Sequence, residues 1–325
     1  MSNLTKNKKN YLKKLTTNSG IINALAIDQR GSLKKMLGKT GGNVEQTIKK
    51  FKKSVSKELT PYASAILLDP EYGWDAVDTK DNKTGLLMAY EETGYDASEE
   101  GRLPDLLPNY SVKRLKENGV DAIKILLYYD KDEGEHINDI KKAFVERVGS
   151  ECIGEDIPFF LEIVTYDKYI KDVKGTEYAK IKPEKVIESM REFSNERYNV
   201  DVLKVEVPVN MNFVEGYSDS EYVHTKQEAK EYFKAQSEAT NLPFIFLSAG
   251  VTIDLFKKTL ILAGESGSKF NGVLCGRATW KDSVEIFTDQ GEEQAKIWLQ
   301  TTGKINVVDL DTILKNHATP IADLM

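Results

Sequence analysis

The run Val200-Asp201-Val202-Leu203-Lys204-Val205-Glu206-Val207, closed by Pro208, is the most informative part of this chain. Its apolar and β-branched residues predict a strand, yet Lys204 interrupts it, and lysine is almost never fully buried without a partner. Lys124 repeats the pattern inside the apolar run 121–127. Two interpretations stay open: a strand at a sheet edge with one face in water, or a buried amine that loses its charge and becomes a nucleophile.

Eight short apolar runs alternate with helical patterns along the chain. The runs lie at residues 21–28, 64–69, 85–90, 121–127, 158–164, 200–207, 243–248 and 271–276. Near-continuous apolar strands are typical of a parallel sheet that helices cover on both faces. We therefore expect a (β/α)8 TIM barrel, a single domain over residues 1–325 with residues 1–20 as an N-terminal extension. The alternative is a doubly wound open sheet, although no G-x-G-x-x-G follows the first strand.

The segments between the strands carry the apolar stripes of amphipathic helices. One stripe follows a predicted N-cap at Asn43 and consists of Val44, Ile48, Phe51, Val55 and Leu59. The other face of this helix is rich in lysine and is expected in solvent. A second stripe, over residues 186–193, is expected to follow a helix start near Pro183, and a third begins at Ile253.

Composition and charge describe an acidic globular protein. Over 325 residues the formal net charge is −6, so neither nucleic acids nor anionic membranes are expected as partners. Cys152 and Cys275 lie far apart, without the spacing of a disulfide framework or a zinc site. The N-terminus lacks the apolar run of a signal peptide, and no apolar stretch of about 18 residues follows it. We expect a cytoplasmic protein with no membrane span.

Barrel enzymes carry their chemistry where the strands end, at the C-terminal mouth of the barrel. Because side chains alternate along a strand, Lys204 and Glu206 are predicted to face inward together. The same alternation turns Lys124 of the fourth strand and Glu162 of the fifth strand inward, and the first strand ends at Asp28. The predicted mouth thus holds two lysines and three carboxylates. Asp28 as a cap of the next turn, and the two glutamates as structural ion-pair partners, remain alternatives.

The loops after the seventh and eighth strands are candidates for a phosphate site, because barrels commonly bind phosphate there. Ser248 and Gly250 follow the seventh strand, and Gly276 and Arg277 follow the eighth. The glycines let the backbone approach an anion, and the guanidinium offers a fork of donors. Ordinary left-handed turns beside a surface arginine are the alternative.

Two further segments receive different predictions. Asp69 precedes Pro70 and is predicted to be a turn residue, so it is not a site candidate. Residues 91–110 form a long connection that contains Gly94, Gly101, Pro104 and Pro108. We interpret this connection as a functional or interface loop.

These residue types together suit aldol cleavage. A neutral lysine adds to a ketone and forms an iminium, which draws electrons from the adjacent breaking carbon–carbon bond. Lys124 near Lys204 favours the neutral amine by repulsion, whereas the carboxylates favour the charged form, so the sequence leaves the balance open. The histidines lie outside every predicted strand end, at His136, His224 and His317. A zinc-dependent aldolase is therefore not expected, and the predicted site has no metal.

Five runs resemble the tagatose 1,6-diphosphate aldolases of Gram-positive bacteria, over nearly the whole chain. They are ALAIDQRG at 24–31, LLDPEYG at 67–73, GRLPD at 101–105, DVLKVEVP at 201–208 and NGVLCGRATW at 271–280. The resemblance implies a class I aldolase of the tagatose 6-phosphate route that needs no metal or other cofactor. Such an enzyme splits D-tagatose 1,6-bisphosphate into dihydroxyacetone phosphate and D-glyceraldehyde 3-phosphate.

The resemblance also implies roles for individual residues. The Schiff-base lysine falls on Lys204, with Asp28, Lys124 and Glu162 beside it, and Ser248 and Arg277 fall at a phosphate. The residues expected to complete the substrate-binding set are Gln29, Glu206, Gly250 and Gly276.

Several alternatives remain at this stage. A sister class I aldolase acting on fructose 1,6-bisphosphate or on a sulfonated ketose phosphate would keep the same lysine, and a sugar-phosphate sensor would bind without turnover. The expected partner is a small phosphorylated sugar, and we expect a homo-oligomer. The sequence leaves open the strictness at C4, the carboxylate that takes the C4 hydroxyl proton, and the second phosphate site.

Overall fold

A closed barrel of eight parallel strands forms the centre of the protein. The computed structural model describes residues 4–38, 43–92, 99–218 and 221–324, and its strands pair in the order β1 to β8, with β8 returning to β1. The strands are β1 (Ile22–Ala26), β2 (Ala65–Leu68), β3 (Gly85–Ala89), β4 (Ala122–Tyr129), β5 (Phe159–Thr165), β6 (Val202–Val205), β7 (Phe244–Leu247) and β8 (Gly272–Cys275). Each lies within or directly beside a predicted run, so the predicted TIM barrel is confirmed and the open sheet is excluded.

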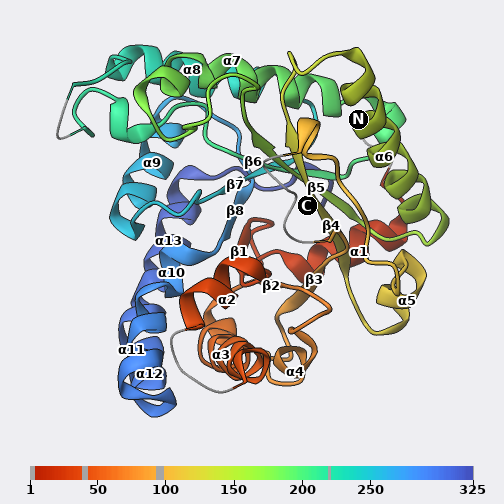
Figure 1. The fold of residues 1–325 in the computed structure, drawn as a ribbon, viewed down its shortest axis with the longest axis vertical. Helices are drawn as coiled ribbons and strands as arrows, with labels where there is room; N and C mark the ends of the chain where they lie inside the picture. Colours follow the sequence, from red (N-terminus) through yellow and green to blue (C-terminus); the bar gives the residue numbers. More distant parts are fainter. Residues whose placement is uncertain (1–3, 39–42, 93–98, 219–220, 325) are drawn as a thin grey trace.

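Helices surround the barrel, as Figure 1 shows. They are α1 (Lys6–Leu15), α2 (Gly31–Leu37), α3 (Val44–Leu59), α4 (Trp74–Val77), α5 (Val112–Glu117), α6 (Glu135–Gly154), α7 (Thr176–Phe193), α8 (Lys226–Glu238), α9 (Ile253–Glu265), α10 (Arg277–Trp280), α11 (Asp282–Gln290), α12 (Glu292–Trp298) and α13 (Lys304–His317). Within the described ranges, none of them combines the length and the apolar character that a bilayer crossing requires.

Side chains alternate along each strand between the barrel interior and the layer that faces the helices. The buried interior contains small and branched side chains, namely Ile22, Ala24, Ala26, Ala65, Leu67, Leu87, Ala89, Ala122, Phe160, Val202, Ile245 and Leu274. Leu203 and Val205 belong to the outer layer that packs under the helices. Lys204 therefore faces inward beside Val202, as the alternation predicted.

Helix α1 closes the barrel at the end opposite the mouth. Leu12 and Leu15 of this helix join the interior cluster, and a side chain at Gly85 would meet the carbonyl of Lys14 at 2.5 Å. The amine of Lys8 binds Asp201, just before β6, at 2.7 Å. The first residues are thus packed against the barrel floor, while their assignment as an extension of one domain stays a prediction.

Two helix starts were predicted, with different outcomes. Asn43 caps α3 as expected, since its side chain accepts from two backbone amides of the first turn. The start near Pro183 is wrong, because α7 begins at Thr176 and the proline lies inside it. A proline there cannot donate to the carbonyl of Ala179, one turn earlier. His224 replaces the missing donor, with Nε2 at 3.0 Å from that carbonyl, and the helix continues.

Candidate active site

Three neighbouring strands bring the two buried lysines to one carboxylate. Glu162 of β5 accepts from Lys124 of β4 and from Lys204 of β6, each at 2.8 Å and each through a different oxygen. Lys124 is 1% exposed and Lys204 is 3% exposed. Both strands lie inside a closed barrel, so the edge-strand interpretation of these lysines is wrong.

Lys124 is surrounded by negative charge. Besides Glu162, its amine contacts Asp28 at 2.9 Å and Glu91 at 2.8 Å. Burial opposes its charge, but the three carboxylates outweigh burial and hold the pKa of Lys124 well above its usual value. Burial likewise disfavours the charged Asp28, yet Lys124 and Lys204 hold the pKa of that carboxyl well below its usual range. Both groups are therefore charged at neutral pH.

Lys204 has fewer partners. Among the ion pairs of the described residues, Glu162 is the one partner of its amine. The three carboxylates around Lys124 oppose the loss of its proton. The two lysines thus share Glu162 but differ in their charge environment, with one carboxylate at the amine of Lys204 and three at that of Lys124.

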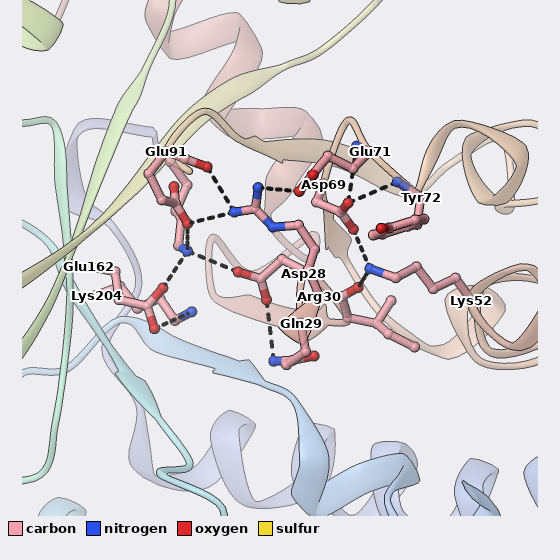
Figure 2. A network of polar contacts seen from close by, with 12 residues as sticks. Asp28, Gln29, Arg30, Lys52, Asp69, Glu71, Tyr72, Glu91, Glu162 and Lys204 are labelled. Carbon is pink, nitrogen blue, oxygen red and sulfur yellow. Dashed lines mark hydrogen bonds and ion pairs between the residues drawn. The ribbon is translucent and has the colours of Figure 1, made fainter. Parts of the chain in front are cut away.

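The residues that complete the lysine cluster, Glu91 and Arg30, were not on the predicted site list. Glu91 lies two positions after the last residue of β3, where alternation continues the inward face of Ala89. Arg30 donates to the backbone carbonyl of Glu91 at 2.8 Å and to the carboxylate of Glu71 at 2.8 Å. Figure 2 shows these contacts continuing from the lysine cluster towards the end of β2. Extending the third predicted strand by one residue would have revealed Glu91.

A second buried ion pair supports the ends of β1 and β2. Lys52 of α3 pairs with Asp69, and its amine also donates to the carbonyl of Ile27 at 2.7 Å. Asp69 accepts the backbone amides of Glu71 and Tyr72 at 3.1 and 2.9 Å, which confirms its predicted role in a turn. The lysine-rich face of α3 was predicted to lie in solvent, and this prediction is wrong at Lys52, which is fully buried. Its position four residues after Ile48 places it on the apolar face.

The predicted phosphate loops lie against each other. A side chain at Gly250 would meet the guanidinium carbon of Arg277 at 3.3 Å, so the arginine lies over this glycine. Ala249 and Gly250 have φ of 48° and 76°, a left-handed conformation that is strained for alanine. Ser248 is buried at the end of β7. No ion pair among the described residues involves Arg277, so the arrangement combines a cation with exposed backbone at Ala249 and Gly250, as an anion site requires.

Gln29 and Gly276 connect these loops to the lysine cluster. The amide of Gln29 donates to Asp28 at 3.3 Å, and a side chain at Gly276 would meet that amide nitrogen at 3.3 Å. Within the described residues, the buried carbonyl oxygen of Gln29 has no hydrogen-bond partner. Gln29 thus lies between Asp28 and the loop after β8, and its side-chain carbonyl oxygen can still accept a hydrogen bond.

Glu206 has a different environment from the one predicted. Its carboxylate accepts from the amide and hydroxyl of Thr165 at 2.8 and 2.7 Å, and it pairs with Lys182 at 3.2 Å. Its partners are therefore not the two site lysines, and Glu91 occupies the place expected for a third carboxylate.

Of the long connection 91–110, Gly94 lies outside the described residues.

The chain is similar in sequence to known aldolases. A family model described as DeoC/LacD family aldolase matches residues 22–282. A protein named tagatose 1,6-diphosphate aldolase 1, from Enterococcus faecalis, is 59% identical over 321 residues, which cover 99% of this chain and 98% of the relative. A tagatose 1,6-diphosphate aldolase 2 from Streptococcus agalactiae is 56% identical over 319 residues, with coverages of 97% and 98%.

Two solved structures with a similar fold bear aldolase names. An archaeal fructose 1,6-bisphosphate aldolase superposes with a TM-score of 0.58 at 14% identity, covering 91% of this chain and 98% of its own. A fructose-bisphosphate aldolase from Plasmodium falciparum gives a TM-score of 0.68 at 14% identity, with coverages of 95% and 96%. At this identity the likeness supports the barrel fold alone.

Proposed function

The chain belongs to the DeoC/LacD family of aldolases, and on that premise we propose that it cleaves D-tagatose 1,6-bisphosphate into dihydroxyacetone phosphate and D-glyceraldehyde 3-phosphate. The observation that carries the proposal is the single carboxylate, Glu162, shared at 2.8 Å by two buried lysines of unequal charge environment. Relatives that are 56% to 60% identical over nearly the full chain bear the name tagatose 1,6-diphosphate aldolase.

The reaction begins with a carbon–nitrogen bond. The neutral amine of Lys204 attacks C2 of the open-chain ketose, and the carbonyl oxygen takes a proton to form a carbinolamine. Glu162 contacts this amine at 2.8 Å, and we assign the next proton transfer to it. Protonating the carbinolamine hydroxyl releases water and leaves a positively charged iminium at C2.

Cleavage then moves electrons into that iminium. A carboxylate removes the C4 hydroxyl proton, the C3–C4 bond breaks, and its electron pair forms an enamine on C3 and C2 while the aldehyde departs. The side chains of Asp28 and Glu162 are each 11% exposed, whereas that of Glu91 is 4% exposed, and its contacts with Lys124 and Arg30 both use Oε1. We therefore assign the base to Asp28 or Glu162. Protonation at C3 and addition of water at C2 release the ketone phosphate and free Lys204.

The loops after β7 and β8 are assigned to the C1 phosphate, because C1 is bonded to the carbon that Lys204 attacks. Arg277 supplies the charge, while Ser248 and Gly250 supply donors at the end of β7. Glu206 is assigned a supporting role through Thr165 and Lys182. A homo-oligomer and a cytoplasmic location stay predictions from the sequence.

Borohydride trapping tests the assignment of the nucleophile. Treating the enzyme with dihydroxyacetone phosphate and borohydride should reduce the iminium and label one peptide, the one that contains Lys204. K204M should lose both trapping and cleavage, whereas K180M, at an exposed lysine of α7, should keep both. Trapping that persists in K204M would overturn the assignment. Parallel assays with fructose 1,6-bisphosphate measure the selectivity at C4.

A further inference from the structure

Most cations near the mouth of the barrel are neutralised by neighbouring carboxylates. The pairs are Lys124 with Asp28, Glu91 and Glu162; Arg30 with Glu71 and Glu91; Lys52 with Asp69; Lys182 with Glu206; and Lys185 with Asp130, Asp132 and Asp167. No ion pair between described residues involves Arg102 or Arg277. These two arginines are therefore available to an anionic ligand, and Arg277 already has a proposed ligand in the C1 phosphate.

The backbone holds Arg102 in an unusual conformation. Its φ is 45°, and that of Gly101 before it is 79°, so two successive residues are left-handed. Gly101 packs so closely on α6 that a side chain there would meet Ile137 at 2.6 Å. Left-handed backbone is strained for arginine, and such strain is concentrated at functional sites. The turn directs the Arg102 side chain towards two tyrosines.

Arg102 lies over the aromatic rings of Tyr128 and Tyr166. Its guanidinium carbon is 5.1 Å from the first ring centre and 4.6 Å from the second. Tyr128 is on the inward face of β4, four residues after Lys124, and Tyr166 follows the last residue of β5. Lys141 donates to the hydroxyl of Tyr166 at 2.8 Å and fixes that ring. Stacking occupies the face of a guanidinium and leaves its in-plane N–H donors for an anion.

We propose that Arg102 binds the C6 phosphate of the open-chain ketose bisphosphate. The inference rests on the proposed function, which bonds C2 to Lys204 and assigns the C1 phosphate to the loops after β7 and β8. Carbons C3 to C6 extend from C2 in the direction away from C1. In a closed barrel of eight strands, β4 lies opposite β8, so the chain of carbons extends towards the ends of β4 and β5. Arg102 lies on that side and, among the ion pairs of the described residues, has no carboxylate partner.

The phosphate at C6 can be removed from the substrate, which gives a direct test. The wild-type enzyme should cleave tagatose 1,6-bisphosphate with a higher kcat/KM than tagatose 1-phosphate. R102M should lower kcat/KM for the bisphosphate by about 10- to 100-fold, the range for one lost charged hydrogen bond, and leave that for the 1-phosphate unchanged. R102K should recover part of the difference, since an ammonium keeps the charge but lacks the fork.

Two control variants separate the possible outcomes. R277M should weaken the cleavage of both substrates, because both carry the C1 phosphate. R147M, at an exposed arginine of α6, should leave both values unchanged. If R102M leaves the preference for the bisphosphate intact, or lowers kcat/KM for both substrates equally, the C6 assignment is overturned while the proposed function stands. A wild-type enzyme that cleaves neither substrate would instead overturn the proposed function.

Discussion

Lys124 and Lys204 are nearly equivalent in position and differ in charge environment. Both face inward from strands that flank β5, both are almost fully buried, and both contact Glu162. Lys124 has three carboxylate partners, whereas Lys204 has one. Burial therefore does not distinguish the two lysines, whereas the number of neighbouring carboxylates does, and around Lys124 these carboxylates raise the pKa of the amine.

The largest effect is expected from removing the shared carboxylate. E162Q leaves Lys204 without an ionic partner and removes the proton donor for carbinolamine dehydration. We expect kcat to fall by about 10²- to 10⁴-fold, the usual contribution of general acid–base catalysis. E91Q is the matched control, since it takes one carboxylate from Lys124 and none from Lys204. Steady-state kinetics that show equal losses in the two variants would contradict the proposed difference between the lysines.

A second prediction compares the lysines by their contribution to stability. K124M leaves Asp28, Glu91 and Glu162 buried without their common cation, so we expect a loss of about 3 to 5 kcal/mol in the free energy of unfolding. K204M should cost less, because Glu162 keeps its contact with Lys124. Urea denaturation followed by circular dichroism measures both. Equal losses would show that the number of carboxylates does not distinguish the two positions.

The smallest effect is a pH dependence at Asp28. Its folded-state pKa is lowered from 3.8, so its stabilising contribution is present above the unfolded-state pKa and is lost as pH falls through the folded-state pKa. The difference in unfolding free energy between wild type and D28N should be constant from about pH 5 to 8 and should shrink in acid. A difference that grows as the pH falls below 3.8 would have the wrong sign for a carboxylate held charged by the lysines.

The sequence predicted the faces of the strands better than the partners of the side chains. Alternation along a strand is local, so the inward positions of Lys124, Glu162 and Lys204 followed from their neighbours. The partner of Glu206 depends on a helix 24 residues earlier in the chain, and no local pattern identifies Lys182 for this role. Long-range pairing of this kind is set by how helices pack on the barrel.

The buried ions Lys52 of α3 and Glu91 after β3 were missed for a related reason. Lys52 lies among lysines that do face solvent, and its pairing with Asp69 compensates for the burial of its charge. Glu91 lies beyond the apolar run that defined the third strand. The fold was thus predictable from apolar periodicity, whereas the charged supports of the site required the three-dimensional arrangement.

The proline inside α7 has a consequence for the order in which substitutions can accumulate in this chain. Pro183 is tolerated because the imidazole of His224 donates to the carbonyl that the proline leaves without its helical partner. A carbonyl only accepts, so Nε2 must carry the proton. A substitution of His224 alone would leave a buried acceptor unsatisfied, whereas replacing Pro183 first would restore the helical donor. The two positions are therefore expected to diverge in a fixed order, with the proline lost before the histidine.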